Sequence, residues 1–168
     1  EQARELGMQV IIELLIQHTS DAHPWFQQAR RSPTSPFRDY YIWSDNNEDD
    51  ISPMFPGVEE SVWTWDDEAG QYYRHMFYHH EPDLNLTCPA LLNEIENIIL
   101  FWLKLGVSGF RLDAATHLTA QAGGGDEKKG LWILEHMRRL IEARNPEAIL
   151  LGEVDVDVEA YKDYFGEN

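Results

Sequence analysis

The chain has 168 residues, of which 43 % are apolar and 12 % aromatic, a globular composition that excludes a disordered tail. Thirty acidic residues against thirteen basic ones give a formal net charge of −17, which repels phosphate backbones and anionic membranes. We therefore expect neither nucleic acid nor a membrane as a partner. The single cysteine, Cys88, excludes an internal disulfide and indicates a reducing compartment, which we expect to be the cytoplasm.

Helices and short apolar strands alternate outside the middle of the sequence. The chain starts at Glu1 rather than Met, and its first segment is interpreted as the end of a helix inside a longer domain. Strands without a polar face, alternating with helices, are typical of a parallel sheet covered by helices, so the expected fold class is α/β. In chain order the sequence predicts a helix ending at Gly7, a strand over 8–16, a helix over 88–106, a strand over 107–113, a helix over 126–146, a strand over 147–154 and a further helix beginning within 157–167.

Residues 19–88 are of a different kind. They hold 13 of the 20 aromatic residues, and a structureless loop of this length is improbable inside a compact domain. Bulky residues alternate on either side of a turn at 67–70, which predicts a hairpin. We interpret 19–88 as a subdomain inserted over the end of the sheet, with residues 1–18 and 89–168 forming the main domain.

The strand predicted over 107–113 carries an arginine and an aspartate on one face. Alternate residues of a strand share a face, so Arg111 and Asp113 point one way while Phe110 and Leu112 point toward the helices. Burying either charge alone is costly, whereas the pair is tolerated at the end of a strand. The guanidinium also favours the ionised form of the carboxylate.

The next predicted strand ends in a second acid. Glu153 follows Asp113 by 40 residues (153 − 113), a suitable length for one strand–helix–strand unit. Neighbouring parallel strands lie about 4.8 Å apart, so the two carboxylates can approach the ~5–5.5 Å separation of a retaining glycosidase pair. The carboxyl end of the strands is also where β/α barrels carry out their chemistry. A structural ion pair beside a solvated glutamate is the open alternative.

Histidines allow several interpretations. His18, at the end of the first predicted strand, could donate a hydrogen bond to a bound hydroxyl or could cap the following loop. His75 and His79 invite a zinc site, but the strand-like alternation around them disfavours a shared helical face. A metal-dependent amidohydrolase could use His18 and His23 with the two acids, yet the sequence lacks a strand with two histidines on one face.

Four motifs carry a resemblance to a known family. "ELLIQHTSDAHPWF" (13–26), "EPDLN" (81–85), "GFRLDA" (109–114) and "LLGEV" (150–154) resemble, in order and spacing, motifs of the α-amylase superfamily of glycoside hydrolases. Within it, segments such as "PFRDYYIWSDN" and "DYFGE" look most like the trehalose synthase group, with oligo-1,6-glucosidases next. The resemblance implies part of a (β/α)8 TIM barrel, about strand 3 to strand 5, with a subdomain inserted after strand 3.

The resemblance also implies roles. Asp113 would attack the anomeric carbon, Glu153 would act as acid and then base, and Arg111 would orient Asp113. The implied reaction is α-retaining glucosyl transfer by double displacement on a small α-glucoside such as maltose. The particular reaction expected is the interconversion of maltose and trehalose. If water is the acceptor instead, the reaction is hydrolysis of the α-glucosidase or oligo-1,6-glucosidase type. A third alternative is a non-catalytic relative that binds sugar. In it Trp63 and Trp65 could stack on sugar rings, although these two side chains could instead form a small hydrophobic core. The residues implied to bind substrate are His18, Glu13 and Asp83.

Several positions depart from the family pattern. Glu13 stands in place of the usual Asp, Glu81 in place of Gln, and the loop 116–125 differs from the trehalose synthase pattern. No cofactor is implied as required. A structural calcium ion would use Gln17 and Asp83, but Gln17 replaces the usual Asn, and the longer side chain displaces its oxygen beyond what ligands near ~2.4 Å tolerate. Because the third acid and other barrel strands are absent from these residues, the remainder of its own barrel is an expected partner, and the chain alone is expected to be inactive.

Overall fold

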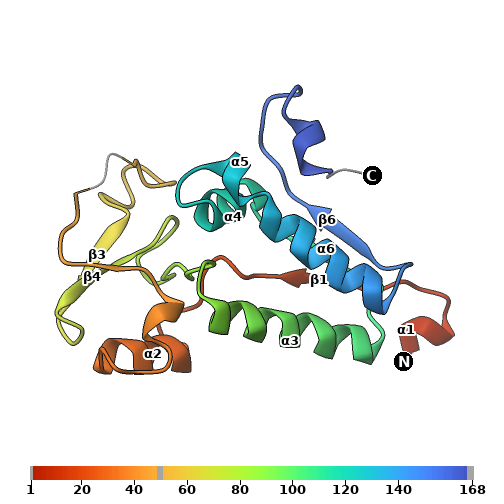
Figure 1. Cartoon of the computed structure of the whole chain (residues 1–168), viewed down its shortest axis with the longest axis horizontal. Coiled ribbons are helices and arrows are strands. Elements are labelled where there is room, and N and C mark those ends of the chain that lie inside the picture. Colours follow the sequence, from red (N-terminus) through yellow and green to blue (C-terminus); the bar gives the residue numbers. More distant parts are fainter. Residues whose placement is uncertain (1, 49–50, 166–168) are drawn as a thin grey trace. The chain divides into compact units, whose positions relative to one another are not determined.

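The computed structural model describes residues 2–48 and 51–165 (Figure 1). These described residues form two compact units: one comprises those within 1–15 and 92–168, and the other those within 16–91. Each unit boundary lies three residues from the predicted limits of the inserted segment, 19–88. The assignment of the units to a barrel and an inserted subdomain stays a prediction.

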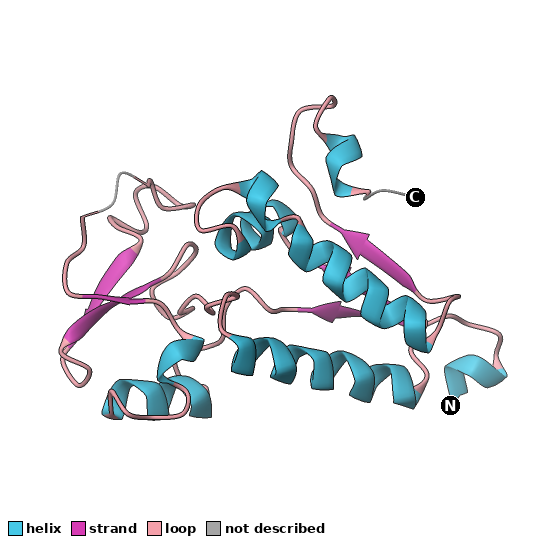
Figure 2. Cartoon of the chain, viewed as in Figure 1, coloured by secondary structure: helices cyan, strands magenta, loops and turns pink. Residues whose placement is uncertain are grey.

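The sheet of the first unit is parallel, as the alternation of helices and apolar strands predicts. Strands β1 (Ile11–Leu14), β5 (Gly109–Leu112) and β6 (Ile149–Gly152) lie in the order β1-β5-β6, and β1 and β6 appear as magenta arrows in Figure 2. A Cβ at Gly109 would lie 2.3 Å from the carbonyl oxygen of Ile149, so glycine lets β5 and β6 pair closely. The predicted α/β class is therefore confirmed.

The helix ends and the buried faces of helices and strands in this unit agree with those predicted from the sequence. Helix α1 (Gln2–Glu5) ends before Gly7, whose φ of +71° marks the predicted helix end. The helix predicted over 88–106 is confirmed as α3 (Pro89–Leu105). Phe110 and Leu112 are buried, as expected for the face of β5 that points toward helices, whereas Arg111 is half-buried. The buried apolar side chains of the helices are Leu91, Ile95 and Ile99 of α3 and Ile133, Met137 and Ile141 of α6.

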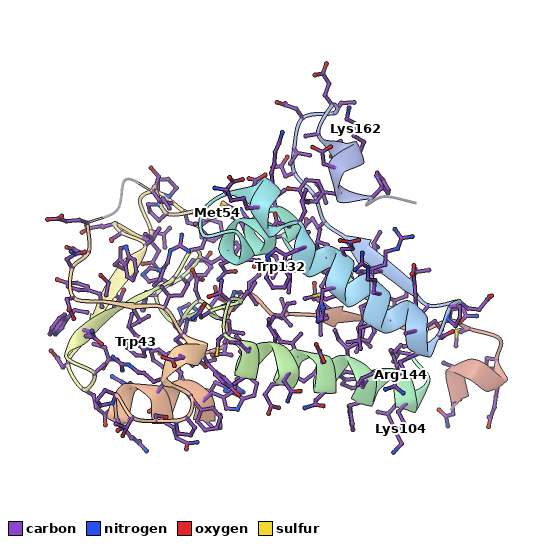
Figure 3. All side chains as sticks on the ribbon, viewed as in Figure 1. Trp43, Met54, Lys104, Trp132, Arg144 and Lys162 are labelled. Carbon is purple, nitrogen blue, oxygen red and sulfur yellow. The ribbon has the colours of Figure 1, made fainter. Side chains whose placement is uncertain are left out.

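The region between β5 and β6 departs from prediction. The single helix expected over 126–146 is two helices, α5 (Glu127–Gly130) and α6 (Trp132–Arg144), and a further helix, α4 (Ala115–Ala122), occupies what the sequence indicated as a loop. Small and polar residues hide the apolar period of α4, which is nonetheless largely buried. Trp132, labelled in Figure 3, donates its indole N–H to the carbonyl of Ala122 at 3.3 Å and so connects α6 to the end of α4.

The end of the chain is less helical than expected. The element predicted within 157–167 is a single 3-10 turn, η2 (Tyr161–Tyr164), while residues 166–167 of that prediction lie outside the described residues. Within the described part of the chain, no helix combines the length and apolar character needed to cross a membrane.

The second unit contains the predicted hairpin. Strands β3 (Trp63–Asp66) and β4 (Gln71–Arg74) pair antiparallel around a turn with Gly70 at φ +64°, and β2 (Trp43–Ser44) pairs with the other edge of β4. Helix α2 (Pro24–Arg31) and the 3-10 turn η1 (Arg38–Tyr40) precede them.

An aromatic core holds this unit together. The ring of Phe26 is stacked on Trp43, with centroids 5.6 Å apart, and meets Tyr41 and Tyr73 edge-on. Trp65 is not part of this core: it is 48 % exposed and meets Tyr72 edge-on. Four of the aromatic residues that distinguish 19–88 in the sequence, Phe26, Tyr41, Trp43 and Tyr73, therefore pack against one another.

Candidate active site

Arg111 is the centre of a cluster of carboxylates at the end of the parallel sheet. Its Nη1 donates to Oδ1 of Asp113 at 2.6 Å and also to Oε1 of Glu13. Its Nη2 donates to Oε2 of Glu153 at 2.9 Å. The structure thus brings together four residues that the sequence singled out, from three different strands or strand ends.

The strand register explains why the two acids meet. Leu112 pairs with Gly152 in the last step of the β5–β6 ladder, and the next residues are Asp113 and Glu153. The N–H of Glu153 donates to the carbonyl of Leu112 at 2.9 Å, and the N–H of Ala115 donates to the carbonyl of Glu153 at 2.7 Å. The backbone of Glu153 is therefore fixed on both sides, opposite Asp113. Glu13 reaches the same place because it pairs with Arg111 across β1 and β5.

The cluster is open to solvent and carries more negative than positive charge. The side chains of Arg111, Asp113 and Glu153 are 35 %, 33 % and 56 % exposed. The hydrogen bond with Asp113, followed by that with Glu13, raises the pKa of Arg111 above its ordinary value. Ion pairs this exposed contribute little to folding stability, so a purely structural role explains the cluster poorly. Three carboxylates beside one fixed cation can instead act on a ligand that enters from solvent.

The residue after Asp113 was not found by sequence reasoning. Ala114 has φ 41° and ψ 55°, and its N–H donates to Oε2 of Glu153 at 3.3 Å. A glycine here would have signalled a left-handed turn, but an alanine in this conformation gives no signal in the sequence.

Three predicted residues, His18, Gln17 and Asp83, lie in the second unit. The strand predicted over 8–16 ends at Leu14, so His18 comes four residues after the end of β1. It lies in an antiparallel pairing of residues near 17–21 with 80–84, in which the N–H of Leu84 donates to the carbonyl of Gln17 at 2.7 Å. The His18 ring meets Phe77 edge-on, and its Nε2 lies 3.9 Å from Oε1 of Glu81.

Asp83 is buried and is a poor calcium ligand. Its side chain is 1 % exposed, its Oδ1 accepts the N–H of Met76 at 3.1 Å, and its Oδ2 lies 3.7 Å from the guanidinium of Arg74. Burial raises the pKa of Asp83 to about 6. Calcium prefers several anionic oxygens, but no group of three or more acidic, histidine or cysteine side chains suited to a metal occurs within residues 2–48 and 51–165. Buried Gln17 with Asp83 therefore fits calcium poorly, and the absence of a required cofactor stays a prediction.

The other histidines have separate partners. Fully buried His75 has its Nε2 3.0 Å from the hydroxyl of Thr64, and burial lowers its pKa. His79 has its Nδ1 3.0 Å from the carboxylate of Glu59. His23 accepts the N–H of Trp25 at 3.2 Å and so caps α2. These contacts give no support to a zinc or amidohydrolase site.

An α/β fold with two carboxylates side by side at the carboxyl ends of neighbouring parallel strands has the arrangement of a retaining glycoside hydrolase domain. The chain belongs to the alpha-amylase family: the family model described as alpha amylase, catalytic domain, matches residues 1–168. This confirms the resemblance drawn from the four motifs.

Individual relatives agree with this family. The chain is 41 % identical over 168 residues to a trehalose synthase from Pimelobacter sp. (strain R48), covering 98 % of this chain and 29 % of the relative. It is 38 % identical over 117 residues to an oligo-1,6-glucosidase from Parageobacillus thermoglucosidasius, covering 67 % of this chain and 20 % of the relative. The solved structure of an alpha-amylase from H.orenii superposes with a TM-score of 0.83 at 35 % identity, covering 97 % of this chain and 32 % of that one. The chain thus spans less than a third of each of these proteins.

Proposed function

We propose that this chain supplies the nucleophile and the acid–base residue of an enzyme that transfers glucosyl groups between α-glucosides with retention of configuration. The observation that carries the proposal is that one guanidinium, Arg111, binds both Asp113 and Glu153, which follow neighbouring parallel strands. Shared hydrogen bonding to one planar group keeps the two carboxylates close, as double displacement requires.

In the proposed reaction, a carboxylate oxygen of Asp113 attacks the anomeric carbon while the bond to the glycosidic oxygen breaks. Glu153 gives its proton to the departing oxygen, which leaves a glucosyl ester on Asp113 and an ionised Glu153. Glu153 then removes a proton from the incoming hydroxyl as that oxygen displaces Asp113. Two inversions at carbon retain the α configuration.

The particular reaction we propose is the interconversion of maltose and trehalose. The name of the Pimelobacter relative supports this choice, as do the trehalose synthase-like segments of the sequence. The released glucose would turn so that its own anomeric hydroxyl attacks the glucosyl ester. His18, Glu13 and Asp83 remain the proposed substrate-binding residues, although burial of Asp83 makes its role indirect.

We further propose that the three parallel strands are a middle part of a (β/α)8 barrel and that the second unit is its inserted subdomain. The remaining strands and a third acid would come from the rest of that barrel, so the 168 residues alone are expected to be inactive. The relatives' greater length supports this proposal. No cofactor is proposed.

The test is to incubate the full-length protein that carries this chain with maltose and to separate trehalose from glucose. Trehalose as the main product, absent when Asp113→Asn is used, supports the interconversion. Glucose as the main product would instead support hydrolysis, the second candidate reaction. The 38 % identity to an oligo-1,6-glucosidase favours this candidate. Sugar binding without any turnover would leave the non-catalytic alternative.

A further inference from the structure

The residue that follows the proposed nucleophile has an unusual backbone. Ala114 is in the left-handed region, and it is the one non-glycine residue with positive φ among residues 2–48 and 51–165. This conformation is unfavourable for alanine because Cβ approaches the following carbonyl oxygen. Such conformations persist only where neighbouring contacts hold them, often at functional sites. The contacts of Ala114 therefore indicate what the conformation achieves.

The left-handed turn directs two consecutive N–H groups at one residue. The N–H of Ala114 donates to Oε2 of Glu153 at 3.3 Å, and the N–H of Ala115 donates to the carbonyl of Glu153 at 2.7 Å. The same Oε2 also accepts from Nη2 of Arg111 at 2.9 Å. One oxygen of the Glu153 carboxyl group thus receives two hydrogen bonds.

This asymmetry determines where a proton is held. A carboxylic acid carries its proton on one oxygen, and an oxygen that already accepts two donors is the poorer position for it. We propose that Ala114 is a positioning residue, whose left-handed backbone aims its N–H at Oε2 of Glu153 and thereby leaves the transferable proton on Oε1. The inference depends on the proposed function, in which Glu153 protonates the departing glycosidic oxygen.

Packing alone does not orient the Glu153 side chain. It is 56 % exposed, so its carboxyl group owes its direction mainly to hydrogen bonds. The backbone ladder to Leu112 and Ala115 places the main chain of Glu153 but does not select between Oε1 and Oε2. The bond from Ala114, together with that from Arg111, makes this selection. Moving the Ala114 N–H should therefore impair proton donation more than it impairs attack by Asp113.

The experiment compares two variants of similar size in the full-length protein. Asparagine tolerates the left-handed region, whereas threonine, being β-branched, does not. Ala114→Asn and Ala114→Thr are each assayed with maltose, whose leaving group needs a proton, and with α-glucosyl fluoride, whose fluoride leaves without one. We expect Ala114→Thr to lower kcat/KM by about 10–100-fold for maltose, a part of what general acid catalysis supplies, but by less than about threefold for the fluoride. Ala114→Asn should stay within about threefold of the wild type for both.

Controls separate orientation from damage to the fold. Ala120→Thr makes the same change at a half-buried position of α4 and should not distinguish the two substrates. Circular dichroism and thermal unfolding check each variant, and Ala114→Val, which is also β-branched, replaces Ala114→Thr if the latter does not fold. Equal losses on both substrates, or equal behaviour of the asparagine and threonine variants, would overturn the positioning role. If the wild type consumes neither substrate, the proposed function itself has failed.

Discussion

The two units of this chain use charged residues in opposite ways. At the end of the parallel sheet, Arg111 is shared among exposed carboxylates that outnumber it. In the aromatic unit, each buried acid has one arginine beside it: Asp66 pairs with Arg30 at 2.8 Å, although Arg30 also lies 3.4 Å from Glu68, and Asp83 lies beside Arg74. Arg38 in that unit lies with its guanidinium 3.8 Å from the ring centre of Trp43.

The difference shows which charges serve folding and which are available for chemistry. A buried, individually paired acid is costly to remove because its partner is left uncompensated. Removing an exposed acid from a shared cluster lowers the free energy of unfolding only slightly, so folding stability does not explain why such an acid is present. Substitutions of the carboxylates around Arg111 should therefore affect activity without affecting stability, whereas substitutions of the buried acids of the second unit should affect stability first.

The largest expected effect is on activity, from Asp113→Asn. An amide cannot form the glucosyl ester, so kcat/KM for maltose in the full-length protein should fall by roughly 10⁴-fold or more, about 5 kcal/mol of transition-state stabilisation. The free energy of unfolding should change by less than about 1 kcal/mol, because the Asp113 side chain is 33 % exposed and Arg111 keeps two other partners. Glu142→Gln, which removes an exposed acid paired with Arg138 on α6, is the matched control and should leave activity unchanged. Strong destabilisation by Asp113→Asn would remove the contrast between the units.

Asp66→Ala should give the largest loss of stability. Asp66 is 3 % exposed at its side chain, pairs with Arg30, and accepts the N–H groups of Glu68 and Ala69 in the hairpin turn. We expect the free energy of unfolding, measured in urea, to fall by about 3 kcal/mol, because two backbone donors lose their acceptor and Arg30 keeps only the half-exposed Glu68, at 3.4 Å. Asp67→Ala, at the exposed neighbour, should cost less than about 1 kcal/mol. Equal losses from the two variants would contradict the role assigned to burial.

Asp83 should make the second unit sensitive to pH. Its pKa is raised by burial to about 6, so the folded state favours the protonated form. Its stabilising contribution is therefore complete below the unfolded pKa of about 4 and is lost as pH rises through about 6, a change of roughly 2–3 kcal/mol. Asp83→Asn mimics the neutral group, so its stability relative to wild type should increase between pH 4 and 7 in urea titrations. If the difference in the free energy of unfolding between Asp83→Asn and wild type does not change with pH, Asp83 does not titrate in this range. Asp67→Asn, at an exposed position, serves as the control.

The smallest expected effect concerns calcium. Since Arg74 already supplies a positive charge beside Asp83, adding millimolar Ca²⁺ or removing it with a chelator should shift Tm by less than about 1 °C. Scanning calorimetry with and without the ion measures this. A clear rise of Tm with calcium that disappears in Asp83→Asn would instead establish the site that the family pattern suggests.

Much of the fold could be predicted because its determinants are local. The apolar period of α3 and the alternation in β5 identified both elements and the face that carries Arg111 and Asp113. The hairpin followed from its turn. Periodicity failed where packing depends on small residues, as in α4. It also failed where the apolar run continues past the end of β1, so the strand predicted to end at residue 16 ends at Leu14.

The site was predictable in its acids but not in its backbone. Strand alternation and the position of a strand end were enough to place Asp113 beside Glu153. The bond from Ala114 to Glu153 was not predictable, because neither a left-handed alanine nor the selection between two carboxylate oxygens depends on residue type alone. Likewise, the burial of Asp83 against Arg74 is a tertiary contact that sequence spacing does not report.

The contact between α4 and α5 has a consequence for engineering this chain. A Cβ at Gly130 would lie 1.6 Å from the carbonyl oxygen of Thr119, and one at Gly123 would lie 1.9 Å from that of Asp126. The two glycines therefore allow α4 and α5 to pack closely against each other, and we call residues 115–130 the α4–α5 cassette. Chimeras that exchange this cassette whole with a relative should preserve its internal fit, whereas a graft with a crossover inside it would force backbone atoms into the same space.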